Sequence, residues 1–345
     1  MKTKGLFARN PLDFDLREFE LPPLGDNHVL VKVHACGVCG TDIHFAKDAK
    51  GDYNPLGHEI AAEVLEAGRN VVTCKPGDRV IVEDCAMCGV CENCKNGDVH
   101  HCHNMHNLEG RPGMAQHMVV HERLCDRFEG LDYVPASLTE PQAVALNAVL
   151  HAQIPPAGDV VVFGPGPIGL MCVRLSKMLG AATVGLVGYD AACPREKARF
   201  EAGKRLGADF IVDTAVEDPL EAVRRRFPNG ADRVIVTSPP KSMEQAIPAG
   251  RFGATVSFIG INLGGNSRIT VDVNDLIFNK RSLAPTFAEP AIKFPASLKI
   301  LQKGMMDTRQ IITHTFKLGE HKEIFHGIVD GRQPIIKAVC TPQID

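Results

Sequence analysis

Four cysteines in the first third of the chain follow the spacing C-x2-C-x2-C-x7-C, from Cys88 to Cys102. Thiolates alone can fill all four corners of a tetrahedral zinc, which leaves no position for a substrate and is typical of a structural site. Cys85 stands three residues before Cys88, so an unbroken C-x2-C-x2-C-x2-C ending at Cys94 is a competing ligand set. The same polar loop also offers imidazole ligands, although histidines this dense are usually solvated: His100, His101, His103 and His106.

A second cluster, upstream of the first, combines Cys39 with His58 and Glu59. One sulfur, one imidazole and a carboxylate suit a zinc that keeps an exchangeable position for water or an alcohol, which is typical of a catalytic site. Glu59 could ligate the metal directly or orient His58 from behind it. Thr41 and His44 supply a hydroxyl and an imidazole, so we expect them to carry a proton from the site to solvent.

The turn from Gly164 to Gly169 fits G-x-G-x-x-G and lies between a strand-like run and a helix-like run. In that context the first glycine allows a tight turn, the second admits a pyrophosphate, and the third lets strand and helix pack closely. The sequence therefore predicts a dinucleotide site that includes Gly164, Gly166, Pro167, Ile168 and Gly169.

The choice between NAD and NADP depends on the end of the next strand-like run. An acidic residue there would bind the adenosine ribose of NAD, but the run ends in Gly188, with Asp190 two places late. Asp190 could still reach the ribose, whereas Arg195 could pair with a 2′-phosphate. NAD is the favoured expectation and NADP the alternative.

The elements that must hold these residues change character near residue 150. Short β-type runs separated by Gly, Pro and Asp fill the first ~130 residues and predict a partly barrel-like β domain. From Asp159 onward, strand-like and helix-like runs alternate, as in a doubly wound parallel sheet. After about residue 288 the pattern no longer continues this alternation, so we expect the tail to pack back on the first domain.

Several segments together resemble the zinc-dependent medium-chain alcohol dehydrogenases: Cys36–His44, Gly57-His58-Glu59, Lys75–Val80, the four-cysteine lobe, the glycine turn, Leu206–Asp209 and Ile312–Leu318. The resemblance implies an α/β chain with a GroES-like catalytic domain at 1–146, a Rossmann NAD(P)-binding domain at 147–288 and a returning segment at 289–345. It also implies two zincs per chain, one catalytic and one structural. The structural ligands would be Cys88, Cys91, Cys94 and Cys102.

The resemblance further implies that the catalytic zinc is held by Cys39, His58 and Glu59, with Glu140 at the place of a third-ligand cysteine. Glutamate at this position resembles the sorbitol and polyol dehydrogenase branch, although Glu140 precedes a proline and could simply cap a helix. The expected reaction moves a hydride from a secondary alcohol of a polyol, sugar or sugar acid to NAD(P). The alternative activity is that of an L-threonine 3-dehydrogenase or an aldose dehydrogenase. The alternative that is not an enzyme is a zinc-binding sensor of the same fold.

Composition and charge indicate which classes of binding partner to expect. A formal net charge of −3 with 23% charged residues gives no reason to expect nucleic acid or an anionic membrane. No apolar run approaches the ~20 residues that span a bilayer, and the charged first twenty residues do not resemble a signal peptide, so we expect a cytoplasmic protein. The strand-like Ser282–Phe287 could pair subunits edge to edge, which predicts a homodimer or homotetramer.

Overall fold

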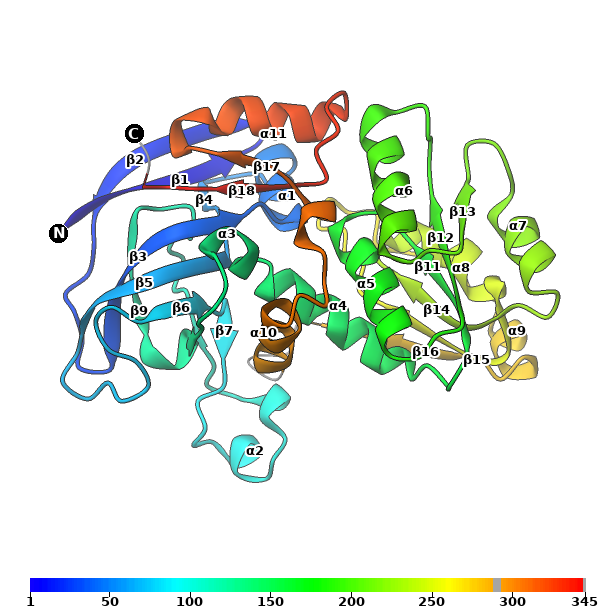
Figure 1. Ribbon diagram of the computed structural model, residues 1–345, viewed down its shortest axis with the longest axis horizontal. Coiled ribbons are helices and arrows are strands. Elements are labelled where there is room, and N and C mark those ends of the chain that lie inside the picture. Colours follow the sequence, from blue (N-terminus) through cyan, green and yellow to red (C-terminus); the bar gives the residue numbers. More distant parts are fainter. Residues whose placement is uncertain (288–292, 344–345) are drawn as a thin grey trace.

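The structure, a computed structural model, describes residues 1–287 and 293–343. Two bodies built on separate sheets lie side by side, with the chain passing between them through helix α4 (Thr139–Ala152) (Figure 1). The predicted domain boundary at 288/289 lies outside the described residues. The other predicted boundary, at 146/147, falls inside α4, so neither limit is more than a prediction.

The first body contains a seven-stranded sheet in which β9 adds to the order β10-β6-β5-β3-β18-β17, and a three-stranded sheet in the order β2-β1-β4. Alternating valines of β3, including Val29, Val31 and Val33, are fully buried between them, which is the period-two pattern of a half-buried strand. The strands are β1 (Lys2–Arg9), β2 (Asp13–Glu20), β3 (His28–Gly37), β4 (Asn54–Pro55), β5 (Glu59–Ala67), β6 (Arg79–Val82), β9 (His117–His121), β10 (Cys125–Arg127), β17 (Ile312–Phe316) and β18 (Lys337–Cys340).

The last part of the chain returns to this first body. Strand β18 pairs antiparallel with β3, so Val339 lies opposite Gly37 and Cys340 opposite Cys36. Helix α11 (His321–Asp330) covers the outside of β17 and β18 near the first strands (Figure 1). The two strands join residues from opposite ends of the sequence next to the predicted catalytic zinc site.

The second body is a six-stranded parallel sheet in the order β13-β12-β11-β14-β15-β16. Successive residues of β11 pack on opposite faces: Val160 and Val162 share a buried cluster with residues of α5 and α6, whereas Val161 and Phe163 share one with residues of α7 and α8. The predicted doubly wound fold is confirmed. Its elements are β11 (Asp159–Phe163), α5 (Pro167–Met178), β12 (Thr183–Gly188), α6 (Pro194–Leu206), β13 (Phe210–Asp213), α7 (Pro219–Arg226), β14 (Ala231–Val236), α8 (Met243–Ala249), β15 (Gly250–Phe258), α9 (Val273–Phe278) and β16 (Ser282–Pro285).

Helix α4 ties the two bodies together because its buried side chains and carbonyls are shared between them. The Ser257 hydroxyl of β15 donates to the Ala148 carbonyl at 2.8 Å, and the Gln142 amide donates to the Ser297 carbonyl of α10 (Phe294–Gln302) at 2.8 Å. These buried hydrogen bonds fix α4 against both bodies.

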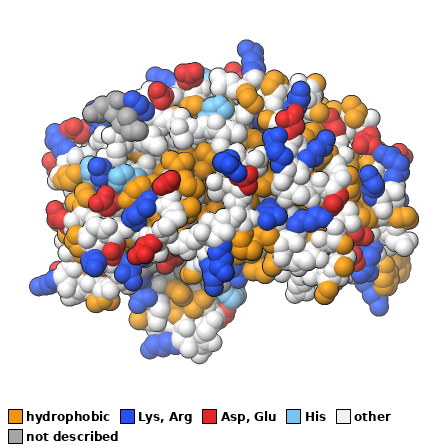
Figure 2. All heavy atoms as spheres, viewed as in Figure 1, with side chains coloured by type: hydrophobic (Ala, Val, Ile, Leu, Met, Phe, Trp, Pro, Cys, Tyr) orange, Lys and Arg blue, Asp and Glu red, His pale blue; other side chains and the backbone are white. Residues whose placement is uncertain are grey.

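The surface carries no block of one charge on the face seen in Figure 2, where acidic and basic side chains are interspersed. Within the described residues, no helix is both long and apolar enough to cross a membrane.

Candidate active site and metal sites

Antiparallel pairing of β3 with β5 brings the first predicted metal group together. Cys39 caps helix α1 (Gly40–Lys47) just after β3 ends, and His58 and Glu59 lie at the start of β5. One donor atom from each of these three side chains lies within 4.8 Å of the others. Gly37 faces Glu59 across the ladder, and a Cβ on Gly37 would stand 1.9 Å from Glu59 Oε2, so only glycine leaves room for this carboxylate.

Asp42 holds the two segments of this group in register. Its Oδ2 accepts from the Cys39 amide at 2.8 Å, and its Oδ1 accepts from the Gly57 amide at 2.8 Å. The side chain is only 1% exposed, so both charge-assisted bonds form away from water. We assigned Asp42 no role from the sequence, although its place three residues after a helix N-cap is the position from which a carboxylate reaches back to the cap amide.

Lys337 is a second residue that sequence reasoning missed. Its ammonium in β18 donates to Glu59 Oε1, and both side chains are buried, while Glu59 Oε2 has no hydrogen-bond partner among the described residues. Burial acts to lower the pKa of Lys337, but the negative charges of Glu59 and Cys39 outweigh it and raise that pKa. A lysine within the apolar run Ile335–Cys340 was the signal available in the sequence.

The donor group attracts positive charge. Burial alone would lower the pKa of His58, yet the neighbouring Cys39 thiolate, together with Asp42 and Glu140, raises it well above its ordinary value. A proton on the imidazole compensates the same negative charges that a divalent cation would compensate. A sulfur, an imidazole, a carboxylate oxygen without a partner and this local charge fit a zinc ion.

Glu140 lies near this group without joining it. It is in the first turn of α4 and is 7% exposed, and it is not one of the three residues whose donor atoms lie within 4.8 Å of one another. Burial raises the pKa of Glu140 to about 8, with Asp84 and Glu59 raising it further and His58 lowering it. The carboxyl is therefore held close enough to His58 for their charges to interact.

The predicted proton path begins at the same place. Thr41 Oγ1 lies 3.8 Å from Cys39 Sγ. His44, one turn further along α1, bonds through Nδ1 to Asp48 Oδ2 at 3.1 Å and keeps 17% of its side chain exposed. The hydroxyl thus lies at the metal group and the imidazole toward solvent, each with its own partner.

The four-cysteine lobe separates the two competing ligand sets. The donor atoms of Cys88, Cys91, Cys94 and Cys102 all lie within 4.8 Å of one another, and Cys85 is outside that group. Backbone amides donate to the sulfurs: Cys88 Sγ accepts from the Cys91 amide at 3.3 Å, and Cys102 Sγ accepts from the Cys88 amide at 3.3 Å. Backbone N–H groups, that of Cys94 first, lower the pKa of Cys91 to about 6. The set that ends at Cys102 and excludes Cys85 therefore fits a structural zinc.

The glycine turn has the geometry that a dinucleotide needs. Gly164 has φ +108°, and a Cβ on Gly169 would stand 1.8 Å from the Gly164 carbonyl, so packing alone requires both glycines. A Cβ on Gly166 would meet nothing within 4 Å, so packing does not require this glycine. Its missing side chain leaves open space at the N-terminus of α5. Pro167 and Ile168 form the first turn of that helix. Such a space beside helix N–H groups fits a pyrophosphate.

A pocket of about 630 Å³ continues from this turn along the carboxyl ends of the parallel strands. Its walls include Gly164, Gly188, Thr214, Ser238 and Gln245, which end or follow β11, β12, β13 and β14 or lie on α8. Ligands of open parallel sheets bind in this crevice. The volume and position fit the adenosine half of NAD(P).

Packing around the end of β12 explains why Gly188 stands where an acidic residue would bind the ribose of NAD. A Cβ there would stand 2.4 Å from Phe200 Cε1 and 2.6 Å from Pro165 Cγ, so no acidic side chain fits at this strand end. Asp190 has φ +65°, and its Oδ1 accepts from the Ala192 amide at 3.2 Å. Asp190 also lines the pocket, so its contact with the ribose stays a prediction.

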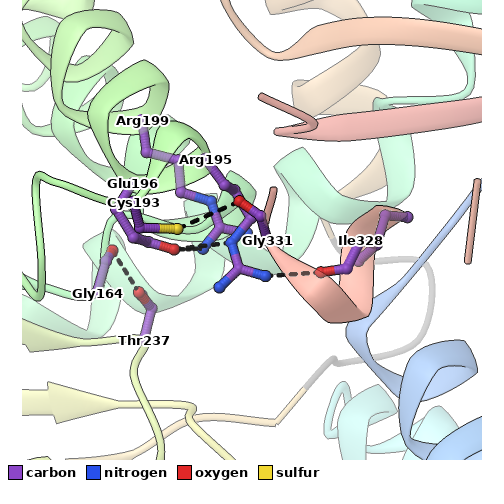
Figure 3. A network of polar contacts seen from close by, with 8 residues as sticks. All are labelled: Gly164, Cys193, Arg195, Glu196, Arg199, Thr237, Ile328 and Gly331. Carbon is purple, nitrogen blue, oxygen red and sulfur yellow. Dashed lines mark hydrogen bonds and ion pairs between the residues drawn. The ribbon is translucent and has the colours of Figure 1, made fainter. Parts of the chain in front are cut away.

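Arg195 belongs to a network on the first turns of α6 (Figure 3). Glu196 Oε1 accepts from Arg195 Nε at 2.8 Å and from Arg199 Nη1 at 2.7 Å. Arg195 Nη1 also donates to the Ile328 carbonyl of α11 at 2.6 Å. Glu196 and Arg199 were missed from the sequence because their i, i+3 spacing on a charged helix is also that of an ordinary surface pair.

Fold and site together define a two-domain oxidoreductase with two metal sites. The alcohol dehydrogenase GroES-like domain matches residues 25–129, and the zinc-binding dehydrogenase domain matches residues 167–303. The chain belongs to the zinc-dependent medium-chain alcohol dehydrogenases and is an NAD(P)-dependent enzyme.

Similar proteins match nearly the full length of this chain. Sorbitol dehydrogenase of Bacillus subtilis is 27% identical over 98% of this chain and 97% of its own length. D-arabitol-phosphate dehydrogenase of Enterococcus avium is 28% identical over 94% of both chains. A solved dehydrogenase of Sinorhizobium meliloti, assigned to the zinc-binding class and bound to NADP, superimposes with a TM-score of 0.86 at 26% identity and covers 99% of this chain and all of its own.

Proposed function

We propose that this enzyme oxidises a secondary alcohol of a polyol, sugar or sugar acid and transfers the hydride to NAD(P). The observation that carries the proposal is the donor group of Cys39, His58 and Glu59, with the buried carboxyl of Glu140 near it at the place of a third-ligand cysteine. A site with more oxygen donors suits a polyhydroxylated substrate that can bind through two oxygens. The sorbitol and arabitol-phosphate dehydrogenases among the relatives support the same substrate class.

In this proposal Cys39, His58 and Glu59 hold the catalytic zinc, and Cys88, Cys91, Cys94 and Cys102 hold the structural zinc. A catalytic zinc lowers the pKa of an alcohol hydroxyl, and a bound nicotinamide accepts the hydride. Thr41 takes the proton at the metal group and His44 releases it on the solvent side. Lys337 balances the charge of Glu59, which lets the carboxylate stay buried.

The test is a panel of polyols, aldonates, aldoses, L-threonine and ethanol, each assayed with NAD and with NADP. We expect kcat/KM for a C5–C6 polyol or sugar acid to exceed that for ethanol by roughly 100-fold or more, because unpaired polar groups in the site penalise a substrate without the extra hydroxyls. The Cys39→Ser variant provides the background rate. Comparable efficiency on ethanol would contradict the polyol proposal, and a strong preference for L-threonine or an aldose would replace it.

We also propose that two copies pair through β16. This strand forms the edge of the six-stranded sheet, and large apolar side chains near it are exposed: Ile277 by 62%, Phe278 by 75% and Phe287 by 76%. An exposed edge strand beside apolar side chains is a template for pairing with a second strand. Antiparallel pairing of two β16 strands would give a closed dimer with two-fold symmetry.

A further inference from the structure

We infer that Asp98, His100 and His101 form a further metal site on the outside of the four-cysteine lobe, which takes a divalent transition-metal cation such as Zn²⁺ or Ni²⁺. The donor atoms of these three side chains lie within 4.8 Å of one another, and the group shares no residue with the two metal groups described above. The sequence offered the two histidines as alternative ligands of the structural zinc, and the structure places them in a separate group. The inference does not depend on the substrate or on the choice of cofactor.

One carboxylate brings the two imidazoles to a common point. His100 Nε2 lies 2.9 Å from Asp98 Oδ1, and His101 Nδ1 lies 2.8 Å from Asp98 Oδ2. The ring centroids of the two histidines are 4.6 Å apart, and the rings are tilted by 58° to each other. One nitrogen of each ring therefore faces the carboxylate from its own direction. Two imidazole nitrogens and a carboxylate oxygen supply three of the four ligands that a zinc ion takes.

The backbone holds these residues in a defined turn. Asp98 precedes the 3₁₀ turn η1 (Val99–His101), and in such a turn the side chains of residues i and i+3 lie on the same side, which places Asp98 beside His101. The Asp98 amide donates to the Asn93 carbonyl of α2 (Glu92–Lys95) at 2.9 Å, and the His101 amide donates to the Asp98 carbonyl at 3.1 Å. The Asp98 side chain does not cap the turn, so its carboxylate is available to a ligand.

The contacts within the group contribute little without a cation. The side chains of Asp98, His100 and His101 are 46%, 39% and 67% exposed, and exposed pairs of this kind are weak because water competes for each partner. A divalent cation replaces both contacts at once. Each neutral imidazole then gives the lone pair of the nitrogen that faces Asp98 and carries its proton on the other ring nitrogen, where water accepts it.

The neighbouring metal site adds negative charge. Four thiolates outweigh the charge of one Zn²⁺, so the occupied four-cysteine site is anionic. Cys102, one of its four residues, directly follows His101 in the chain. Together with the Asp98 carboxylate, this charge attracts a second cation to the same lobe.

The donor set and its exposure define which cations bind and how tightly. Imidazole nitrogen suits Zn²⁺, Ni²⁺ and Cu²⁺, whereas Mg²⁺ and Ca²⁺ prefer sites built from oxygen alone. The lobe around α2 projects from the first body (Figure 1), so water can complete the coordination. An open site with three protein ligands exchanges its ion with solvent. We therefore expect desalting to remove this ion and to leave the ions of the two other sites in place.

The direct test is calorimetric titration of the desalted holoenzyme with Zn²⁺, Ni²⁺ and Mg²⁺. Metal analysis before the titration sets the starting zinc content, and the inference concerns the equivalent bound beyond it. We expect one further equivalent of Zn²⁺ or Ni²⁺ per chain, with a dissociation constant on the order of micromolar, and no binding of Mg²⁺. The absence of a saturable further equivalent would overturn the inference, as would Mg²⁺ binding as tightly as Zn²⁺.

Variants identify the ligands. His101→Gln and Asp98→Asn should each weaken the further equivalent by about 100-fold, because even the loss of a residue that only supports a ligand costs about 10- to 100-fold in metal affinity. His103→Gln changes an exposed histidine of the same lobe that lies outside the donor group, so it is the matched control and should leave the affinity unchanged. Equal affinities in His101→Gln, Asp98→Asn and the wild-type enzyme would overturn the inference.

Metal analysis of each desalted variant shows whether the four-cysteine site is intact. A variant that keeps the zinc content of the wild-type enzyme and loses only the further equivalent supports a separate site. If His101→Gln loses tightly bound zinc as well, His100→Gln, one residue further from Cys102, decides the question by the same titration.

Discussion

Lys337 and Glu59, which are 278 residues apart in the sequence, form a buried ion pair within the proposed catalytic metal group, of which Glu59 is a member. Lys337 is in β18 and Glu59 is in β5, and both strands pair with β3, one on each side of it. The last strand of the chain thus completes a site whose other residues all lie in the first half.

Replacing Lys337 with Met should destabilise the metal-free protein by about 3–5 kcal/mol, because it leaves the Glu59 carboxylate buried without a counter-charge. Lys337→Arg keeps the charge and is the control. A Lys337→Met enzyme with unchanged chemical denaturation would show that the pair contributes little.

Cys39→Ser or His58→Ala should reduce bound zinc from two ions per chain to one and abolish turnover, since each variant removes a proposed ligand of the site that performs the chemistry. The melting temperature should change little because the four-cysteine lobe keeps its metal. Full activity in a variant that holds a single zinc would exclude the proposed mechanism.

Cys94→Ser should act first on stability. Structural zinc binding is worth ~10–16 kcal/mol in small zinc peptides, so its loss should lower the melting temperature by roughly 5 °C or more. Cys85→Ser, at a cysteine outside the ligand group, is the matched control and should leave metal content unchanged. If Cys85→Ser loses zinc and Cys94→Ser keeps it, the competing ligand set is the right one.

Glu140 should make the metal-free protein less stable as pH rises. Burial raises the folded-state pKa of Glu140 from 4.5 to about 8, so between these values the folded state holds a proton that the unfolded state has lost. Stability then falls by up to about 1.4 kcal/mol per pH unit through this window.

Glu140→Gln should therefore raise the melting temperature of chelator-treated protein at pH 7.5, with a smaller gain at pH 5. The exposed Glu66→Gln is the control on a neighbouring strand. A gain that is the same at both pH values would mean that packing, and not ionisation, explains it.

Leu283→Asp should convert the proposed dimer to a monomer, because it places a charge on the exposed strand β16. Light scattering after size exclusion measures the mass directly. Leu179→Asp, at an exposed leucine just after α5, is the control and should leave the mass unchanged. A wild-type protein that is monomeric at micromolar concentration would contradict the proposal.

The sequence predicted most of the fold because its signals are local. The valine-rich run at β11 and the glycine turn after it are contiguous, and each needs only its own neighbours to be interpreted. Cys39 and the four-cysteine lobe were equally accessible, since metal ligands require particular residue types at particular spacings.

What the sequence could not predict are contacts between distant elements. Lys337 looks like any lysine near the end of the chain until β18 is placed beside β3. The bond from the Ala192 amide to Asp190 Oδ1 depends on the positive φ of Asp190, which the sequence does not show. Arg199 lines the nucleotide pocket only because α6 packs beside it, which the sequence alone does not show.

Helix α4 limits how the two halves of this enzyme can be exchanged with those of its relatives. Its first turn holds Glu140 near the metal group, and later residues of the same helix bond to β15. A hybrid enzyme joined at 146/147 would combine the two ends of one rigid helix from different parents and would mismatch a buried face on one side. A crossover placed before Thr139 would keep the helix whole and move Glu140 with the nucleotide-binding half.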